Sequence, residues 1–203
     1  GNIGAMFQAA LDASGAAAAY YAPALPRMNR LTRGGIQYID GVPINESVFG
    51  KDPFEPVRSP YIKDLFKNCR AEVVTCQPRN LPPPPQNGQQ IVICDAENAM
   101  DFQYIGTELQ RTNSLKILGG CAGFAAALPP FLGLEGEPIR LPCIKAPLLV
   151  LCGSLNPITK RQLEYGAAHG GIRISLQNEQ LIPDYFASPA GQDFLTQIEQ
   201  QMQ

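Results

Sequence analysis

The segment PLLVLCGSLNPIT combines an apolar run with small and polar residues at a spacing that could bind an anion. Leu148–Leu151 is the kind of continuous apolar run that lies buried in a parallel sheet. Pro157 suits the first turn of a helix, which Ser154 or Asn156 could cap. A strand that continues through Gly153-Ser154 into such a helix would present N–H groups and a helix dipole to a phosphate. An ordinary capped corner would use the same residues.

Two further strand-to-helix corners carry residues of chemical interest. Asp95 follows a strand predicted at Gln90–Cys94, and open α/β sheets bind ligands at the carboxyl ends of their strands. Asp95 could therefore bind a substrate hydroxyl or a metal ion, or it could merely cap the loop. Gly119 and Gly120 would let the backbone approach an anion closely, and they could equally serve helix-to-sheet packing.

Other common site chemistries are not indicated. The chain has no GxxxxGKS/T and no GxGxxG segment, the two frequent phosphate fingerprints. Its one histidine, His169, stands beside two glycines, which suits the end of a helix better than a catalytic triad. Six cysteines stand singly, without metal-ligand spacing, and are predicted to be buried, reduced thiols: Cys69, Cys76, Cys94, Cys121, Cys143 and Cys152. Cys69 and Cys76 could approach each other.

Composition limits the class of protein. The chain has 203 residues, of which 45% are hydrophobic and 17% charged, and its net charge is −2. This balance is typical of a globular protein and gives no electrostatic reason to expect nucleic acid or an anionic membrane as a partner. No apolar stretch predicts a transmembrane span, and the N-terminus has no signal-peptide pattern. A cytoplasmic location is the default expectation.

The elements that must position these residues alternate between helical and extended patterns. Helices are predicted at 3–14 (after Asn2 as cap), 59–69, 98–111 and 122–132, and strands at 16–22, 35–40, 42–44, 71–76, 90–94 and 115–118. Asp40-Gly41 predicts a tight hairpin, and the proline-rich segment 78–88 predicts an exposed loop. The fold class is therefore α/β, a three-layer sandwich around a parallel sheet with an inserted β-hairpin.

The last third of the chain predicts the start of a second α/β domain. Residues 133–146 lack any clear period and indicate a linker. Two β-α units are expected after it, at 148–169 and 172–203, with the last helix beginning at Ser188-Pro189. Two such units make a poor independent core, and both ends of the chain have the pattern of cuts through larger α/β domains.

Five segments follow one another along nearly the whole chain. They are GNIGAMFQAALDASG, RLTRGGIQYIDGVPINESVFGKDPFEPVRS, IVICDAENAMDFQYI, GGCAGFAAALPPFL and VLCGSLNPITKRQLEY. In order and approximate spacing they resemble successive blocks of the four-carbon acid-sugar kinases, a family long known as a domain of unknown function. The resemblance implies an N-terminal domain that binds the sugar acid and a C-terminal domain that binds ATP. ATP would phosphorylate a hydroxyl of threonate, erythronate or a 3-oxo-tetronate.

The resemblance also implies domain bounds and substrate-binding residues. Residues 1–132 would be the rear part of the acid-sugar domain, 133–146 the linker and 147–203 the beginning of the nucleotide domain. The positions that match substrate-binding positions of the family are Gly1, Asn2, Arg33, Gly34, Gly35 and Asp52, and Asp95 is a further candidate. Arg33 has the right chemistry for a carboxylate, because a guanidinium binds it bidentately. A solvated loop charge is the alternative for Arg33.

The ATP-binding residues implied by the resemblance lie in the segment described first. Gly153, Ser154, Asn156 and Thr159 match the family's Gly-Ser-x-Ser-Pro-x-Thr segment. Asn156 replaces its second serine, which weakens any role that needs a hydroxyl. ATP and Mg²⁺ are the expected cofactors, since phosphoryl transfer depends mainly on positioning and charge neutralisation.

The resemblance further implies that catalysis needs residues this sequence does not contain. Members of the family carry an Asp-Asp-Phe-Thr-Gly-Ala segment, where the catalytic base is expected, and Gly-rich loops that hold the ATP phosphates. The catalytic residues of this chain are therefore unknown, with Asp95 as a secondary candidate for the base, and the 203-residue chain alone is predicted to be inactive.

Two alternatives to a kinase remain open at this stage. The chain could be a sugar-acid binding module without catalysis, or another α/β enzyme that acts on nucleotides or sugar phosphates. Partners are expected to be small molecules rather than nucleic acid or membrane. The hairpin at Gly35–Ile44 could pair with a second copy in a homodimer, or could cap its own domain.

Overall fold

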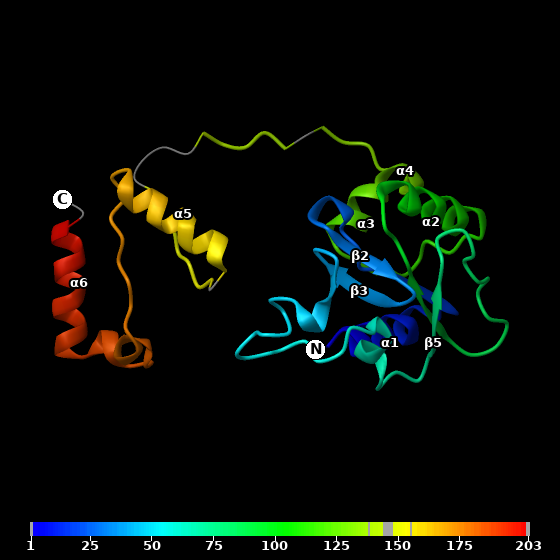
Figure 1. The fold of residues 1–203 in the computed structure, drawn as a ribbon, viewed down its shortest axis with the longest axis horizontal. Coiled ribbons are helices and arrows are strands. Elements are labelled where there is room, and N and C mark those ends of the chain that lie inside the picture. The colour runs from blue at the N-terminus through cyan, green and yellow to red at the C-terminus, as the bar shows by residue number, and fades with distance from the viewer. Residues whose placement is uncertain (1, 138, 144–147, 155, 202–203) are drawn as a thin grey trace. The chain divides into compact units, whose positions relative to one another are not determined.

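The computed structural model describes residues 2–137, 139–143, 148–154 and 156–201 (Figure 1). The chain divides into two compact units, residues 1–139 and 140–203, and each is described by itself. Gly1, which was predicted to bind substrate, lies outside the described residues.

A four-stranded parallel sheet forms the centre of unit 1. Its strand order is β5-β6-β1-β7, formed by β5 (Glu72–Cys76), β6 (Gln90–Cys94), β1 (Ala18–Ala22) and β7 (Leu118–Gly120). The register pairs Tyr20 with Val92 on one side of β1 and with Leu118 on the other. Every residue of β6 is buried. This agrees with its largely apolar sequence, QIVIC, which is typical of a strand covered on both faces.

Helices cover both faces of this sheet. Alternate residues of β1 and β6 pack with the buried side chains of α2 (Ala99–Arg111) and with Phe124 of α3 (Ala122–Ala127). The intervening residues pack with α1 (Ile3–Ser14) and the 3₁₀ helix η3 (Ile62–Phe66). The short α4 (Pro129–Leu132) follows α3. The predicted three-layer α/β sandwich is confirmed, and the two-residue period of the strands explains it.

A small antiparallel sheet is the inserted element of unit 1. It has the order β2-β3-β4, with β2 (Arg30–Arg33), β3 (Ile36–Ile39) and β4 (Val42–Pro43). Two-residue turns join the strands, and all four turn residues have positive φ: Gly34, Gly35, Asp40 and Gly41. Such φ values fit the turns that match the twist of a hairpin. The β3–β4 hairpin was predicted; β2 was not.

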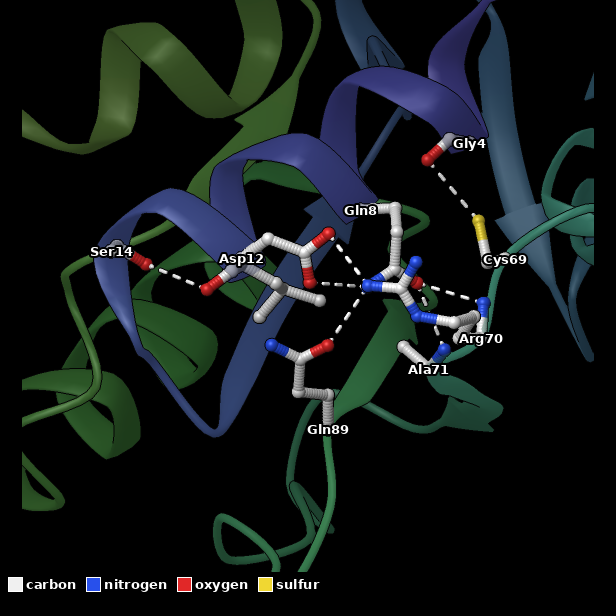
Figure 2. A network of polar contacts seen from close by, with 9 residues as sticks. Gly4, Gln8, Asp12, Ser14, Cys69, Arg70, Ala71 and Gln89 are labelled. Carbon is white, nitrogen blue, oxygen red and sulfur yellow. Dashed lines mark hydrogen bonds and ion pairs between the residues drawn. The ribbon is translucent and has the colours of Figure 1, made fainter.

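Helix α1 is tied to the sheet by the hydrogen bonds of Gln8. Its amide oxygen accepts hydrogen bonds from the backbone N–H groups of Arg70 (2.8 Å) and Ala71 (3.0 Å). Its amide nitrogen donates to Asp12 Oδ1 (3.0 Å) and to Gln89 Oε1 (2.8 Å), as Figure 2 shows. The network therefore joins α1 to both segments that lead into strands β5 and β6.

Most helix boundaries agree with the sequence prediction. Helix α1 ends at Gly15 in the left-handed conformation, and α2 begins with a capping box formed by Asn98 and Asp101. Asn2 occupies the N-cap position of α1 but makes no side-chain capping hydrogen bond. The helix predicted at 59–69 is only the 3₁₀ turn η3, and the strand predicted at 115–118 begins at Leu118 and runs through the glycines.

Two short 3₁₀ turns complete the hairpin region. They are η1 (Pro26–Met28), which precedes β2, and η2 (Ile44–Glu46), which follows β4. All six cysteines are free thiols, as predicted, but only Cys76 and Cys94 are buried. The predicted burial is wrong for the other four: Cys69 and Cys121 are partly exposed, and Cys143 and Cys152 are exposed. Cys76 lies beside Cys94, with 3.8 Å between the sulfurs, rather than beside Cys69, whose sulfur contacts the Gly4 carbonyl.

Unit 2 consists of helices and 3₁₀ turns in its described part. These are α5 (Pro157–Ala168), η4 (Asn178–Leu181), η5 (Tyr185–Ala187) and α6 (Pro189–Gln201). The predicted strand at Leu148–Leu151 is wrong, because those residues are irregular and 64–87% exposed. A lone strand is not stable without neighbours, and the described residues of unit 2 supply none. The strand expected from Ile172 is absent for the same reason.

None of the described helices is both long enough and apolar enough to span a membrane.

Candidate functional site

The candidate site lies where the parallel strands end. All four strands run in the same direction, so Asp95 after β6, Pro23 after β1 and Cys121 after β7 follow the carboxyl ends of their strands. Open α/β sheets bind their ligands at this edge. The hairpin is attached here as well, because Thr32 of β2 and Ala96 exchange backbone hydrogen bonds of 2.9 and 3.0 Å.

Asp95 holds the turn between β2 and β3. Its Oδ2 accepts a hydrogen bond from the Gly34 N–H (2.6 Å) and its Oδ1 accepts one from the Gly35 N–H (2.9 Å). Its side chain is buried, and burial raises the pKa of this carboxyl above its ordinary value although the two N–H groups oppose the shift. The structure therefore favours the capping interpretation of Asp95, and it brings three predicted site residues together.

Arg33 is the cation of this site. One of its terminal nitrogens, Nη2, contacts Glu97 Oε2, and its guanidinium lies 5.9 Å from the centre of the Tyr38 ring. The two charged side chains are 64% and 40% exposed. Hydrogen bonding between them raises the pKa of Arg33 and lowers the pKa of Glu97. Arg33 is therefore an accessible, fully charged group at the carboxyl edge of the sheet.

Asp52 and Asn2 are not joined to this group by any hydrogen bond or ion pair among the described residues. Asp52 Oδ1 accepts hydrogen bonds from the N–H groups of Phe54 and Glu55, both at 2.9 Å, which lower the pKa of this exposed carboxyl. Its observed role is to close its own turn. A substrate-binding role for Asp52, Asn2 and Gly1 stays a prediction.

The two glycines of β7 serve packing. A Cβ at Gly119 would lie 2.3 Å from the Phe7 ring, and one at Gly120 would lie 2.4 Å from the Ala22 carbonyl oxygen. The Cys121 thiol donates to the carbonyls of Pro23 and Ala24. A largely apolar cavity of about 440 Å³ borders this corner. Because the space beside each glycine is already filled, the structure favours the packing interpretation over close approach to an anion.

The predicted ATP-binding residues form a capped helix start in unit 2. The Ser154 hydroxyl accepts a hydrogen bond from the Asn156 N–H (3.2 Å), and Asn156 Oδ1 accepts one from the Ile158 N–H (2.8 Å). Gly153 is exposed, and Thr159 lies in the first turn of α5. Helix capping by Asn156 is confirmed, and His169 lies at the other end of α5, as predicted. Contact of these residues with ATP stays a prediction.

The described residues contain no group of three or more His, Cys, Asp or Glu side chains that could hold a metal ion. Each oxygen of Asp95 already accepts one hydrogen bond from an N–H group. A Mg²⁺ ion prefers several oxygen ligands in octahedral geometry. These side chains therefore do not fit a magnesium site of their own.

Sequence reasoning missed Glu97 and Tyr38, the two neighbours of Arg33. Glu97 gave a usable signal, since it follows the strand-end residue Asp95 by two positions and directly precedes the helix cap Asn98. Tyr38 gave none, because its approach to Arg33 depends on the β2–β3 register.

Comparison with known proteins identifies the family of this chain. The model of the sugar-binding N-terminal domain matches residues 1–128, well over half of the chain. The chain belongs to the four-carbon acid-sugar kinase family. A curated member, the D-threonate kinase of Salmonella typhimurium, is 27% identical over 191 residues, covering 86% of this chain and 42% of that protein. The chain thus spans less than half the length of this relative.

Several solved structures share the fold. A Salmonella typhimurium LT2 protein, solved under the name of a tRNA synthase, has a TM-score of 0.64 and 19% identity, covering 98% of this chain and 49% of its own. A Haemophilus influenzae protein of the domain of unknown function has a TM-score of 0.58 and 20% identity, covering 98% and 50%. A Bordetella bronchiseptica protein, a domain-swapped dimer with bound citrate, has a TM-score of 0.52 and 22% identity, covering 92% and 47%.

Proposed function

We propose that unit 1 binds a four-carbon sugar acid at the carboxyl edge of its sheet, with Arg33 as the group that takes the carboxylate. The match to a sugar-binding domain over residues 1–128 supports this class of ligand, and it is the observation that carries the proposal. The likeness to a D-threonate kinase supports a tetronate. The exposed guanidinium of Arg33 supplies the chemistry, because it can form two parallel hydrogen bonds to a carboxylate.

The other predicted residues at the hairpin turn are proposed to position Arg33 rather than to contact the sugar acid. Gly34 and Gly35 give their N–H groups to Asp95, so these groups are not donors to a sugar. Asp95 is buried and holds the turn that directly follows Arg33, so it fixes the position of the Arg33 backbone. Its proposed part in substrate binding is therefore to position Arg33, while hydroxyl recognition belongs to residues such as Asn2 and Asp52.

The reaction of the whole protein would be phosphorylation of a hydroxyl of the bound acid. ATP is the proposed donor, and Gly153, Ser154, Asn156 and Thr159 are proposed to meet its phosphates at the start of α5. Mg²⁺ would accompany ATP and draw most of its ligands from the phosphates and water, since the described side chains offer no cluster for it. No base is assigned, because Asp95 is engaged with the turn.

The 203-residue chain alone is proposed to bind without phosphorylating. Phosphoryl transfer needs an enclosed site that orients donor and acceptor. The described residues around Gly153 are exposed and irregular, which does not enclose a nucleotide. Homodimer formation and a cytoplasmic location remain expectations; the domain-swapped dimer of the Bordetella protein makes light scattering of this chain worthwhile.

Calorimetric titration with D-threonate tests the proposal. We expect binding by the unaltered chain and a loss of about tenfold or more in Arg33→Ala, since a hydrogen bond to a charged group is removed. Arg111→Ala is the matched control, because Arg111 also forms an exposed ion pair with a glutamate, on α2. Threitol, which lacks the carboxylate, should bind the unaltered chain and Arg33→Ala equally. Absence of D-threonate binding, or equal binding by Arg33→Ala, would contradict the assignment, and ATP-dependent phosphorylation by this chain would contradict its inactivity.

A further inference from the structure

The Arg33–Glu97 ion pair is built by backbone contacts on both sides. Arg33 lies between Thr32, which is bridged to Ala96, and the turn held by Asp95. On the other side, the Glu97 N–H donates to Asp101 Oδ2 (2.7 Å) in the first turn of α2. The short segment 95–97 therefore holds the hairpin and also supplies a negative charge to its arginine.

This ion pair leaves most of the binding capacity of Arg33 unused. One nitrogen of Arg33 meets one oxygen of Glu97, whereas a guanidinium has five N–H donors and can bind a carboxylate through two parallel hydrogen bonds. Both side chains are exposed to water, where an ion pair contributes little free energy. A carboxylate that arrives with better geometry could therefore displace Glu97 at small cost.

Glu97 would still influence the ligand after it is displaced. The neighbouring Asp95 cannot neutralise the displaced Glu97, because Asp95 is itself an acid and is bonded to the Gly34 and Gly35 N–H groups. The displaced Glu97 would remain a negative charge next to the bound carboxylate. Like charges at this distance repel, although solvent weakens the effect.

We propose that Glu97 is an internal competitor that lowers the affinity of the site for acid ligands by occupying Arg33 when no ligand is bound. The inference rests on the proposed function, since it requires Arg33 to bind the carboxylate of a sugar acid. It assigns Glu97 to setting the affinity of the site for acids. Any ligand without a carboxylate would have no group with which to replace Glu97.

Glu97→Gln tests the proposal, because glutamine keeps the size of the side chain and removes its charge. In calorimetry at low salt with the full chain and D-threonate, we expect the Kd to fall by about threefold, the scale of an exposed ion pair. Glu108→Gln is the matched control: it removes one negative charge from the exposed pair with Arg111, and its Kd should be unchanged. In an Arg33→Ala background, Glu97→Gln should have no effect.

The outcomes separate this inference from the function on which it rests. Binding by the unaltered chain with an equal or larger Kd in Glu97→Gln would overturn the competitor role and leave the function standing. No binding in either form would overturn both. Binding that appears only in Glu97→Gln would support strong competition. Reaction of Arg33 with phenylglyoxal, followed by peptide mass spectrometry, adds a ligand-free readout: it should be faster in Glu97→Gln than in Glu108→Gln, and equal rates would count against the pairing.

Discussion

Gln8 satisfies hydrogen-bonding groups from three parts of unit 1 with one amide. It bonds Asp12 within its own helix, the N–H groups at the start of β5 and the Gln89 side chain before β6. Both its donors and its acceptor are used, and its side chain is largely buried. A buried polar side chain of this kind specifies one arrangement of the elements that it joins.

Gln8→Leu is predicted to destabilise unit 1 by about 2–4 kcal/mol, because two backbone N–H groups lose their acceptor at a part-buried site. Urea denaturation measures this change. Gln103→Leu, on an exposed position of α2, should change the free energy of unfolding by no more than about 0.5 kcal/mol. Equal effects of the two substitutions would show that the network contributes nothing specific.

Asp95 predicts an unusual pH dependence for a carboxylate. Its pKa is raised in the folded chain, so folding favours its protonated form. Its contribution to stability is then complete below the pKa of the unfolded chain and is lost as the pH rises through the folded pKa. The difference in unfolding free energy between the unaltered chain and Asp95→Asn should therefore decrease from about pH 3 to pH 7.

Asp52→Asn gives the opposite sign and serves as the control. The pKa of Asp52 is lowered, so its contribution is present above the unfolded pKa and is lost as the pH falls through the folded pKa. Carboxyl carbon NMR gives a direct check, with Asp95 titrating above its ordinary value and Asp52 below. If Asp95 titrates below its ordinary value, the effect of the two glycine N–H groups on its pKa outweighs that of burial.

At the scale of elements, the β2–β3 hairpin determines where Arg33 lies. Its turn has positive φ at Gly34 (59°) and Gly35 (71°), a conformation that costs other residues energy. The surroundings of the two glycines differ. A Cβ at Gly34 would meet nothing within 4 Å, whereas a Cβ at Gly35 would lie 2.9 Å from Thr75 Oγ1 on β5.

Alanine substitutions in this turn are predicted to differ in cost. Gly34→Ala should destabilise by about 1–2 kcal/mol through its φ alone, and Gly35→Ala should cost more because Thr75 must also move. Gly34→Asn should cost less than Gly34→Ala, since asparagine tolerates the left-handed region. Thermal unfolding of the three variants gives the order, and equal costs would mean that the turn relaxes away from Thr75.

Elements with a local signal could be predicted, and those without one could not. The cap at Asn98, the stop at Gly15 and the turn at Asp40-Gly41 are encoded within a few residues. The sequence RLTR of β2 has no such signal, because its pairing depends on β3 and on the bridge to Ala96. The candidate site divides in a similar way: Asp95 was singled out by its place after a strand and Arg33 by the family resemblance, whereas the approach of Tyr38 to Arg33 depends on the β2–β3 register.

At the scale of the whole chain, burial is concentrated in unit 1. Both clusters of buried apolar side chains lie there. In the described part of unit 2 only Gly191 is buried, and the apolar residues Leu148–Leu151 face solvent. Since apolar burial is the main source of stability, unit 1 is expected to fold cooperatively while unit 2 gains little from its own contacts.

Hydrogen exchange should separate the two units. Backbone amides of β1 and β6 are expected to exchange only through global unfolding of unit 1, whereas amides at 148–154 and 171–177 should exchange almost as fast as in a free peptide. Mass spectrometry of peptic fragments can measure both. Strong protection at 148–154 would mean that unit 2 has a partner in solution, and addition of ATP would show whether a nucleotide is that partner.

The distribution of the cysteines gives this protein a natural chemical label for its own unfolding. Cys76 and Cys94 lie in the core of unit 1, and both the adjacent thiol and burial raise the pKa of Cys94, which suppresses the reactive thiolate. Cys143 and Cys152 are exposed in unit 2. Iodoacetamide should alkylate the exposed pair from the start of the reaction. It should alkylate the core pair only when unit 1 opens. The ratio of the two would report the opening rate without any engineered probe.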